Sequence, residues 1–225
     1  MEDEQYAKMS SMTVSVHMVR HGEVFNPDKV LYGRLPGFGL SSLGHQMAEE
    51  VTDMWQPAPQ ILVASPLQRA QETIAPLAQR FQLEVRTDDR VIEAENKFQG
   101  LSDMRRQLRS PKLWPLVMNP FRPSWGEPYH QQVQRVASAI QDLRDELMVS
   151  HGPGSSAVVV SHQLPIWVTR LSAEGKSLAH DPRNRQCSLA SVTSFTFAPG
   201  QRVPTVSYAE PVRHLSLQAA ALPGA

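Results

Sequence analysis

Two histidines and two arginines lie at or after the ends of short apolar runs of this chain. Side chains of these types can bind an anion and attack it. The ends of the three runs read Arg20-His21-Gly22, then Ser65 with Arg69 four residues later, then Ser161-His162. Guanidinium groups bind oxyanions through two parallel hydrogen bonds, and an imidazole can act as a nucleophile or as an acid or base. If the three ends meet, they suit a phosphoryl group: the arginines neutralise its charge, one histidine attacks phosphorus and the other donates a hydrogen bond.

The three apolar runs have the pattern of strands that could bring these side chains together. Val14, Val16 and Met18 alternate with polar residues and would share one face of a strand. Residues 61–64 and 157–160 are uninterrupted apolar runs, which are typical of buried strands. In open α/β sheets, ligands bind at the carboxyl ends of the strands. The candidate residues would therefore lie at one sheet edge if the strands are neighbours.

Helical patterns alternate with these strands. Ser41 and Ser42 are N-cap candidates for a helix that reaches about residue 55. A second helix is expected to begin at about Pro66, with Arg69 on its first turn, and to end near Phe81. Further expected elements are a short strand at 84–87, helices at 127–149 and 164–171, and a hairpin at 189–197 and 203–208. The alternation predicts an α/β fold with a mostly parallel sheet and an antiparallel edge.

The chain reads as a single domain over residues 1–225, because no internal repeat or linker interrupts it. We expect its core at about 13–210 and loose tails at 1–11 and 215–225. The periodicity breaks down in a proline-rich, irregular insertion at about 95–129. Long irregular insertions are often lids or binding loops, and the alternative is a solvated surface excursion.

Composition narrows the class of protein. Lysine plus arginine and aspartate plus glutamate both total 22, so the formal net charge is zero, which argues against a nucleic-acid or polybasic membrane surface. Cys187 is the only cysteine, so no internal disulfide forms, and we expect it to be buried rather than nucleophilic. The longest apolar runs are only strand-sized, and the first eleven residues lack an apolar signal segment. These features predict a cytoplasmic protein, and the sequence does not indicate its oligomeric state.

A metal centre is not expected. His17 and His21 have the i, i+4 spacing of helical metal ligands, but they fall on a strand and its exit, and no His-Glu-x-x-His motif occurs. A metal hydrolase is therefore the less favoured alternative, and no cofactor is predicted.

Four segments, in this order, resemble the histidine phosphatase superfamily, in its phosphoglycerate-mutase-like branch. They are Arg20-His21-Gly22-Glu23, the run Ser65-Pro66-Leu67-Gln68-Arg69-Ala70-Gln71-Glu72-Thr73, Glu93, and Val160-Ser161-His162. The resemblance covers about residues 13–198. It implies a three-layer α/β/α sandwich with a cap inserted between Glu93 and the second histidine strand.

The resemblance also implies roles for individual residues. His21 would be the nucleophile that becomes phosphorylated, His162 would share the phosphate pocket, and Glu93 would protonate the leaving oxygen, with Glu95 as the alternative donor. Phosphate ligands are expected to be Arg20, Arg69, Asn26 and Gly22. Substrate contacts are expected from Tyr32, Arg34, Arg105 and Arg106.

The expected function is a metal-independent, histidine acid phosphatase-like enzyme that hydrolyses a small phosphomonoester through a phosphohistidine. Its partner would be a small phosphorylated molecule rather than nucleic acid or a membrane. Two alternatives remain open: a mutase that returns the phosphoryl group to a bound phosphoglycerate, and a catalytically weak module that binds a phosphorylated ligand, because fold does not fix function.

Overall fold

A six-stranded sheet with the strand order β3-β2-β4-β1-β5-β6 forms the centre of the computed structural model, which describes residues 12–102 and 126–219. Its strands are β1 (Val14–Arg20), β2 (Ile61–Ala64), β3 (Val85–Thr87), β4 (Ser156–Ser161), β5 (Val192–Phe197) and β6 (Thr205–Ala209). The first four strands pair in parallel, whereas β5 pairs antiparallel with β1 and β6 with β5. The predicted mostly parallel sheet with an antiparallel edge is confirmed.

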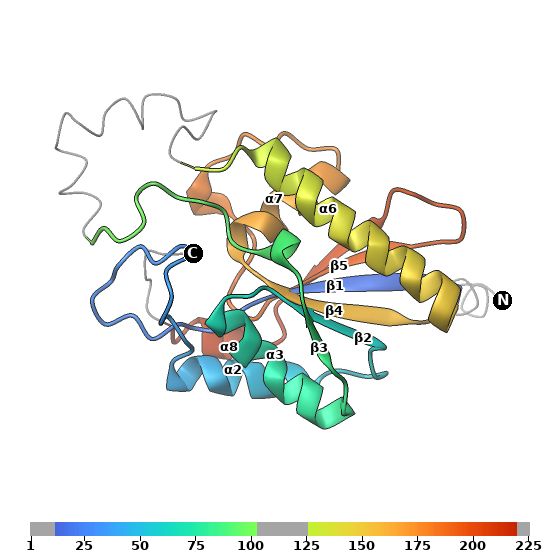
Figure 1. Cartoon of the computed structure of the whole chain (residues 1–225), viewed down its shortest axis with the longest axis horizontal. Helices are drawn as coiled ribbons and strands as arrows, with labels where there is room; N and C mark the ends of the chain where they lie inside the picture. The colour runs from blue at the N-terminus through green and yellow to red at the C-terminus, as the bar shows by residue number, and fades with distance from the viewer. Residues whose placement is uncertain (1–11, 103–125, 220–225) are drawn as a thin grey trace.

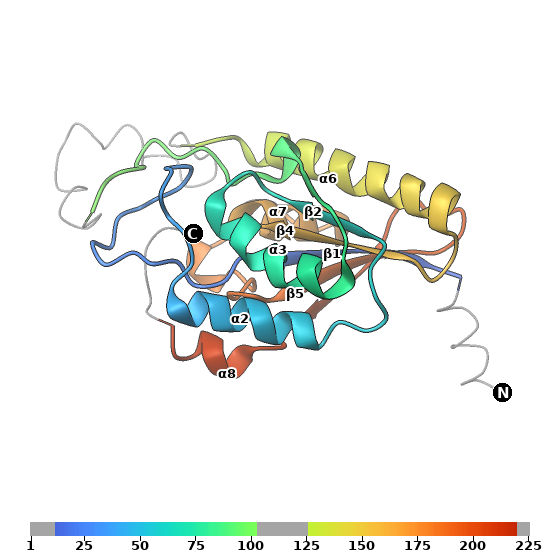
Figure 2. The same ribbon diagram turned by 60° about the horizontal axis from the view of Figure 1, so that its bottom comes forward.

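Helices cover both faces of the sheet (Figure 1). The helices are α2 (Ser42–Asp53), α3 (Gln68–Phe81), α6 (Tyr129–Glu146), α7 (Gln163–Ala173) and α8 (Arg213–Ser216), with short turns at η1 (Asp89–Val91), η3 (Leu147–His151) and η4 (Pro182–Asn184). In Figures 1 and 2, α2, α3 and α8 lie on one side of the sheet, and α6 and α7 lie on the other. The fold is the three-layer α/β/α arrangement that the resemblance implied.

The alternation of side chains along the strands divides the core into two clusters. Val16 and Met18 of β1 pack in one cluster with residues of α6 and α7, such as Ile140 and Ile166. Val19 faces the other side and packs with residues of α2 and α3. Period-2 alternation in β1 therefore anchors the strand to both helical layers, which fixes its register strongly.

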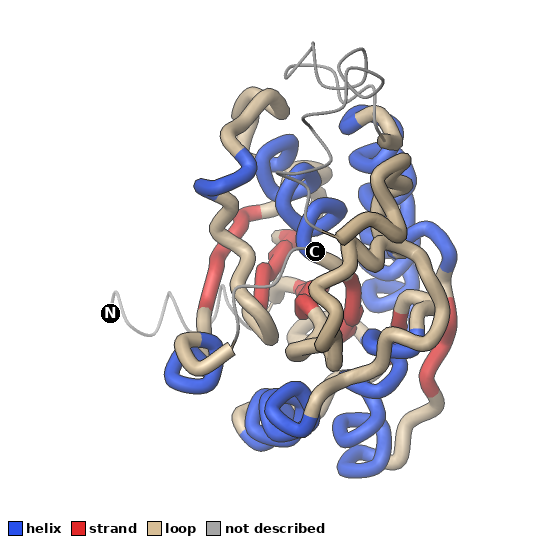
Figure 3. The backbone as a smooth tube through the Cα atoms, turned by 90° about the vertical axis from the view of Figure 1, so that its left-hand side faces the viewer, coloured by secondary structure: helices blue, strands red, loops and turns tan. Residues whose placement is uncertain are grey.

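The register of the parallel strands brings their carboxyl ends to the same level. Arg20 of β1 lies opposite Ser161 of β4, and Ala64 of β2 lies opposite Val160. The backbone continues this pairing past the strands, because the amide of His21 donates to the Ser161 carbonyl at 3.1 Å. Figure 3 faces this end of the molecule, where loops cross in front of the strands. The sheet neighbours required by the sequence analysis are therefore present.

Among the expected boundaries, those of the second helix and of the C-terminal tail differ from the structure. The second helix begins at Gln68, two residues later than Pro66, and its N-cap residue Leu67 has an extended backbone. Leu215 was expected in a loose tail, but it is 3% exposed and packs with the α2–α3 cluster through the short helix α8.

Parts of three expected segments lie outside the described residues. These parts are 1–11 of the first tail, 103–125 of the cap insertion and 220–225 of the second tail. Within the part of the chain that the structure describes, no helix is long and apolar enough to cross a membrane.

Candidate active site

His21 lies directly beyond the end of β1 and is completely buried. Its Nδ1 is 2.8 Å from the carbonyl oxygen of Gly22. A carbonyl can only accept, so Nδ1 carries the proton and the neutral ring presents an unprotonated Nε2. This Nε2 has no hydrogen-bond partner among the described residues. The imidazole is therefore oriented as a nucleophile needs to be.

Two guanidinium groups flank His21. Burial and the charges of Arg69 and Arg20 hold the pKa of His21 well below its usual value of 6.5. Arg20 and Arg69 are 8% and 1% exposed, respectively. The Arg20 Nη1 donates to the Cys187 carbonyl at 2.7 Å, and the Arg69 Nη2 donates to the Gly33 carbonyl at 2.7 Å. The arginines thus keep His21 neutral and supply positive charge beside its nucleophilic nitrogen.

His162 follows β4 and lies beside His21, with the two ring centroids 5.2 Å apart. It is also completely buried. Its Nε2 is 2.7 Å from the hydroxyl oxygen of Ser65, the residue that follows β2. Its Nδ1 has no hydrogen-bond partner among the described residues. Burial, followed by the charge of Arg69, lowers the pKa of His162 well below 6.5.

Glu93 is the buried carboxyl group of this region, at 5% exposure. Its Oε1 accepts a hydrogen bond of 2.8 Å from the Ala94 amide, and its Oε2 has no hydrogen-bond partner in the described part of the chain. Burial raises the pKa of Glu93 above 4.5, against the charges of Arg69, Arg20 and Arg185. By contrast, the side chain of Glu95 is 73% exposed and pairs with Arg34. The geometry therefore favours Glu93 over Glu95 as a proton donor.

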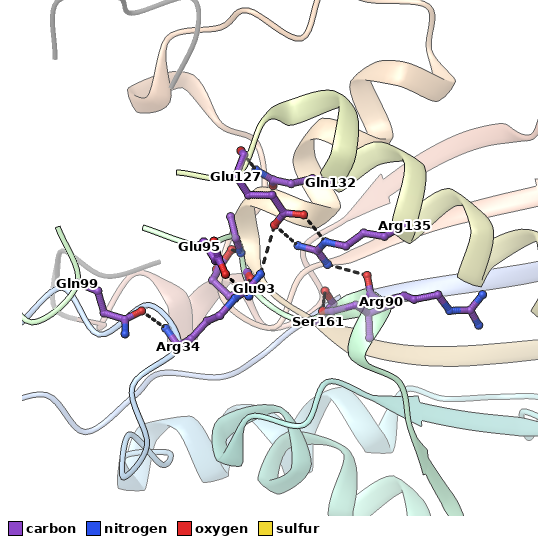
Figure 4. Close-up of polar contacts among 11 residues, drawn as sticks. Arg34, Arg90, Glu93, Glu95, Gln99, Glu127, Gln132, Arg135 and Ser161 are labelled. Atoms are coloured by element: carbon purple, nitrogen blue, oxygen red, sulfur yellow. Dashed lines mark hydrogen bonds and ion pairs between the residues drawn. The ribbon is translucent and has the colours of Figure 1, made fainter. Parts of the chain in front are cut away.

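A polar network anchors the segment that carries Glu93 (Figure 4). The Arg34 Nε donates to the Glu93 carbonyl at 2.7 Å, and its two terminal nitrogens contact Glu95 and Glu127 at 3.3 Å each. Arg135 of α6 donates to both carboxylate oxygens of Glu127, at 2.7 and 2.9 Å. Glu127 thus joins the loop after β1 to α6, with the Glu93 segment held between them.

Comparison with known proteins identifies the family of this chain. The model of the histidine phosphatase superfamily (branch 1) matches residues 16–208. The chain belongs to this superfamily. The uncharacterised protein Rv0525 of Mycobacterium tuberculosis is 48% identical over 199 residues, which cover 87% of this chain and 96% of that protein.

Solved structures with phosphatase names share the fold. A mycobacterial glucosyl-3-phosphoglycerate phosphatase, Rv2419c, is 24% identical with a TM-score of 0.69, over 87% of this chain and 97% of that one. Phosphoserine phosphatase from Entamoeba histolytica, solved with 3-phosphoglyceric acid, is 20% identical with a TM-score of 0.71, over 90% of this chain and 99% of that one. At these identities the likeness shows the shared fold alone.

Several other residues predicted for a histidine phosphatase superfamily site have structural contacts in the described chain. Both polar atoms of the Asn26 side chain bond the backbone of Val30, at 2.9 and 3.0 Å, and so close the loop after β1. Tyr32 is 4% exposed, and the Arg69 guanidinium lies 4.7 Å from its ring centroid. The phosphate and substrate roles of Asn26, Tyr32, Gly22 and Arg34 stay predictions, and Arg105 and Arg106 lie outside the described residues.

Sequence reasoning assigned no role to two side chains that the structure places beside the predicted superfamily site. Ser65 directly follows an apolar strand, and this position could have identified it as a candidate site residue. Arg185 lies in the loop between η4 and β5, and its charge interacts with those of Glu93 and Arg20. Nothing in the local sequence pattern points to Arg185, because its position depends on how the loop packs against α7.

Proposed function

We propose that this protein is a phosphatase that hydrolyses a small phosphomonoester through a phosphohistidine at His21. The observation that carries the proposal is the buried, unprotonated Nε2 of His21 beside two guanidinium groups. Membership of the histidine phosphatase superfamily and the phosphatase names of two proteins with this fold support it.

In the first step, the Nε2 lone pair of His21 attacks phosphorus, and the bond from phosphorus to the ester oxygen breaks. Arg20 and Arg69 neutralise the charge of the phosphoryl oxygens as it redistributes. With Ser65 donating to its Nε2, His162 presents an Nδ1–H that donates to another phosphoryl oxygen. Glu93 gives its proton to the departing oxygen, so the products are an alcohol, a phosphohistidine and a carboxylate.

In the second step, water attacks the phosphohistidine. The Glu93 carboxylate accepts a proton from that water, and the bond between Nε2 and phosphorus breaks. Inorganic phosphate leaves, and both His21 and the protonated Glu93 are restored. Guanidinium groups supply the positive charge in this scheme, so we expect turnover to persist in the presence of EDTA.

The proposal is tested with His21→Ala and a phosphomonoester that carries a labelled phosphoryl group. We expect wild-type protein, quenched during turnover, to carry an acid-labile label, and the variant to carry none. Turnover should fall by about 1,000-fold or more, because removing a nucleophile removes the covalent route. A comparable rate in His21→Ala would contradict the nucleophile assignment.

His17→Gln is the matched control, because His17 lies on the same strand but contacts Ser194 and Trp55 instead of the candidate site. It should retain wild-type turnover. Incubation with 3-phosphoglycerate, with and without a bisphosphoglycerate primer, separates hydrolysis from mutase activity. Formation of 2-phosphoglycerate faster than release of inorganic phosphate would contradict the phosphatase proposal.

A further inference from the structure

Arg185 supplies a third guanidinium group near the candidate site, from the loop that precedes β5. Its Nε donates to the His180 Nε2 at 2.9 Å, and its Nη1 donates to the Gln163 Oε1 at 3.4 Å. The Tyr129 side chain also interacts with it electrostatically. His180 Nδ1 lies 2.7 Å from the Leu178 carbonyl, so Nδ1 holds the proton and Nε2 is a neutral acceptor. Neutral groups therefore hold Arg185 in place without cancelling its charge.

The position of Arg185 is tied to the phosphate-binding residues. Gln163 directly follows His162, and its Nε2 donates to the Cys187 carbonyl at 3.4 Å. The same carbonyl accepts the hydrogen bond from Arg20. The charge of Arg185 interacts favourably with Glu93 and unfavourably with Arg20. Arg185 therefore lies within electrostatic range of the acid that would protonate the leaving group.

Burying the guanidinium groups of Arg69 and Arg185 costs free energy unless an anion compensates for their positive charge. The Arg185 guanidinium is partly buried, and desolvation lowers its pKa from the usual value of 12.5, although arginine remains charged. Neither Arg69 nor Arg185 forms an ion pair with an acidic side chain in residues 12–102 and 126–219. Buried charges in proteins are normally paired.

The charges around Glu93 indicate which kind of anion would compensate for the guanidinium groups. Arg69, Arg20 and Arg185 are the described cations whose charges act on Glu93. Glu93 must be neutral to donate a proton, and a phosphomonoester carries close to two negative charges at neutral pH. Three guanidinium groups against that dianion leave about one positive charge, which matches a carboxylate better than a second phosphate.

We propose that Arg185 binds a carboxylate on the leaving-group side of the substrate and thereby selects carboxylated phosphomonoesters. This inference rests on the proposed phosphatase function. It assigns substrate recognition to the loop before β5, in addition to the loop and cap residues predicted from the sequence.

The test compares 3-phosphoglycerate with glycerol 3-phosphate, in which a hydroxymethyl group replaces the carboxylate. We expect wild-type kcat/KM to be about 10- to 100-fold higher for 3-phosphoglycerate, the range of a charge-assisted hydrogen bond. Arg185→Gln should remove this preference, mainly by raising KM for 3-phosphoglycerate, and change glycerol 3-phosphate hydrolysis by less than about 3-fold.

Arg183→Gln is the matched control, because Arg183 lies two residues away, its side chain is 88% exposed and it pairs with Asp181. It should keep the wild-type preference. Equal wild-type hydrolysis of both substrates, or an equal loss of both in Arg185→Gln, would overturn the inference while leaving the phosphatase intact. No phosphate from either substrate or from p-nitrophenyl phosphate would contradict the proposed function itself, and the inference with it.

A second variant covers the case in which Arg185→Gln fails to fold, as judged from its melting transition. Arg185→Lys keeps the charge but loses the planar fork that matches a carboxylate. We expect the preference for 3-phosphoglycerate to fall by several-fold, and an unchanged preference would overturn the inference.

Discussion

At the scale of single residues, Gly22 shows how packing places His21. A Cβ built on Gly22 would lie 2.6 Å from the carbonyl oxygen of Gly44 in α2, so only glycine fits there. The Gly22 amide donates to the Thr73 hydroxyl at 3.1 Å, and that hydroxyl donates to the Arg69 carbonyl at 2.7 Å. Helices α2 and α3 therefore both hold the turn that carries His21.

Glu93→Gln should slow hydrolysis according to the basicity of the leaving oxygen. Glycerol 3-phosphate needs a proton on its departing alkoxide, so we expect its kcat/KM, which reports the first step, to fall by about 100-fold or more. p-Nitrophenyl phosphate releases a stable phenolate, so its kcat/KM should change little, although Glu93 also assists hydrolysis of the phosphohistidine and kcat can fall for both substrates. The measurement is the ratio of the two kcat/KM values in wild type and variant.

Glu95→Gln serves as the comparison for Glu93→Gln, because the Glu95 side chain is 73% exposed. It should leave the ratio of the two substrates unchanged. A change of ratio in Glu95→Gln, with none in Glu93→Gln, would transfer the proton donor to Glu95.

Much of the candidate site could be predicted from residues at the ends of apolar runs. His21, His162 and Arg69 follow strands whose order and register bring them together, and both the runs and the residues after them are visible in the sequence. Ser65 also follows an apolar run, but the sequence reasoning assigned no role to it. Arg185 could not be predicted, because its place depends on the contacts of an irregular loop with His180, Gln163 and Tyr129.

At the scale of elements, Glu127 connects segments far apart in the chain. Its carboxylate contacts Arg34 from the loop after β1 and Arg135 from α6, with side-chain exposures of 13%, 27% and 17% for Glu127, Arg34 and Arg135. The Gln132 side chain also donates to the Glu127 carbonyl at 2.8 Å. Sequence periodicity predicted a helix from residue 127, but the helix begins at Tyr129, and Glu127 lies before it as a bridge.

Glu127→Gln should weaken this bridge and disturb Glu93. The change leaves Arg135 without its carboxylate and leaves Arg34 with only the exposed Glu95, so we expect the free energy of unfolding to fall by about 1–3 kcal/mol. Because Arg34 also holds the Glu93 carbonyl, kcat for glycerol 3-phosphate should fall by up to about 10-fold, and more than kcat for p-nitrophenyl phosphate. Denaturant unfolding and steady-state kinetics measure the two effects.

Glu146→Gln is the control for Glu127→Gln, because it removes a more exposed pair, with Arg86 at 55% and Glu146 at 35% side-chain exposure. Such a pair contributes at most about 1 kcal/mol. If the two variants lose the same stability and neither changes the substrate ratio, Glu127 has no positioning role.

At the scale of the whole molecule, burial of neutral histidines makes stability depend on pH. Burial lowers the pKa of His17 to about 4, and the pKa values of His21 and His162 also lie below 6.5. Below pH 6.5 the unfolded chain binds protons that the folded chain excludes. The free energy of unfolding therefore decreases as the pH falls through the unfolded value toward the folded one.

His17 allows this effect to be measured away from the candidate site, because its ring packs edge-on against Trp55 at 5.4 Å and its Nδ1 bonds the Ser194 hydroxyl at 2.7 Å. A lowering of the pKa from 6.5 to about 4 corresponds to about 3 kcal/mol of stability lost between these pH values.

His17→Gln removes this titration, so its free energy of unfolding should fall less than that of wild type between pH 7 and pH 4.5, with activity at pH 7 retained. Urea unfolding at several pH values measures the difference. A His17→Gln curve parallel to that of wild type would show that His17 takes up no extra proton on unfolding, and the acid sensitivity would then come from other groups, such as the remaining buried histidines and the carboxyl groups whose pKa values are lowered.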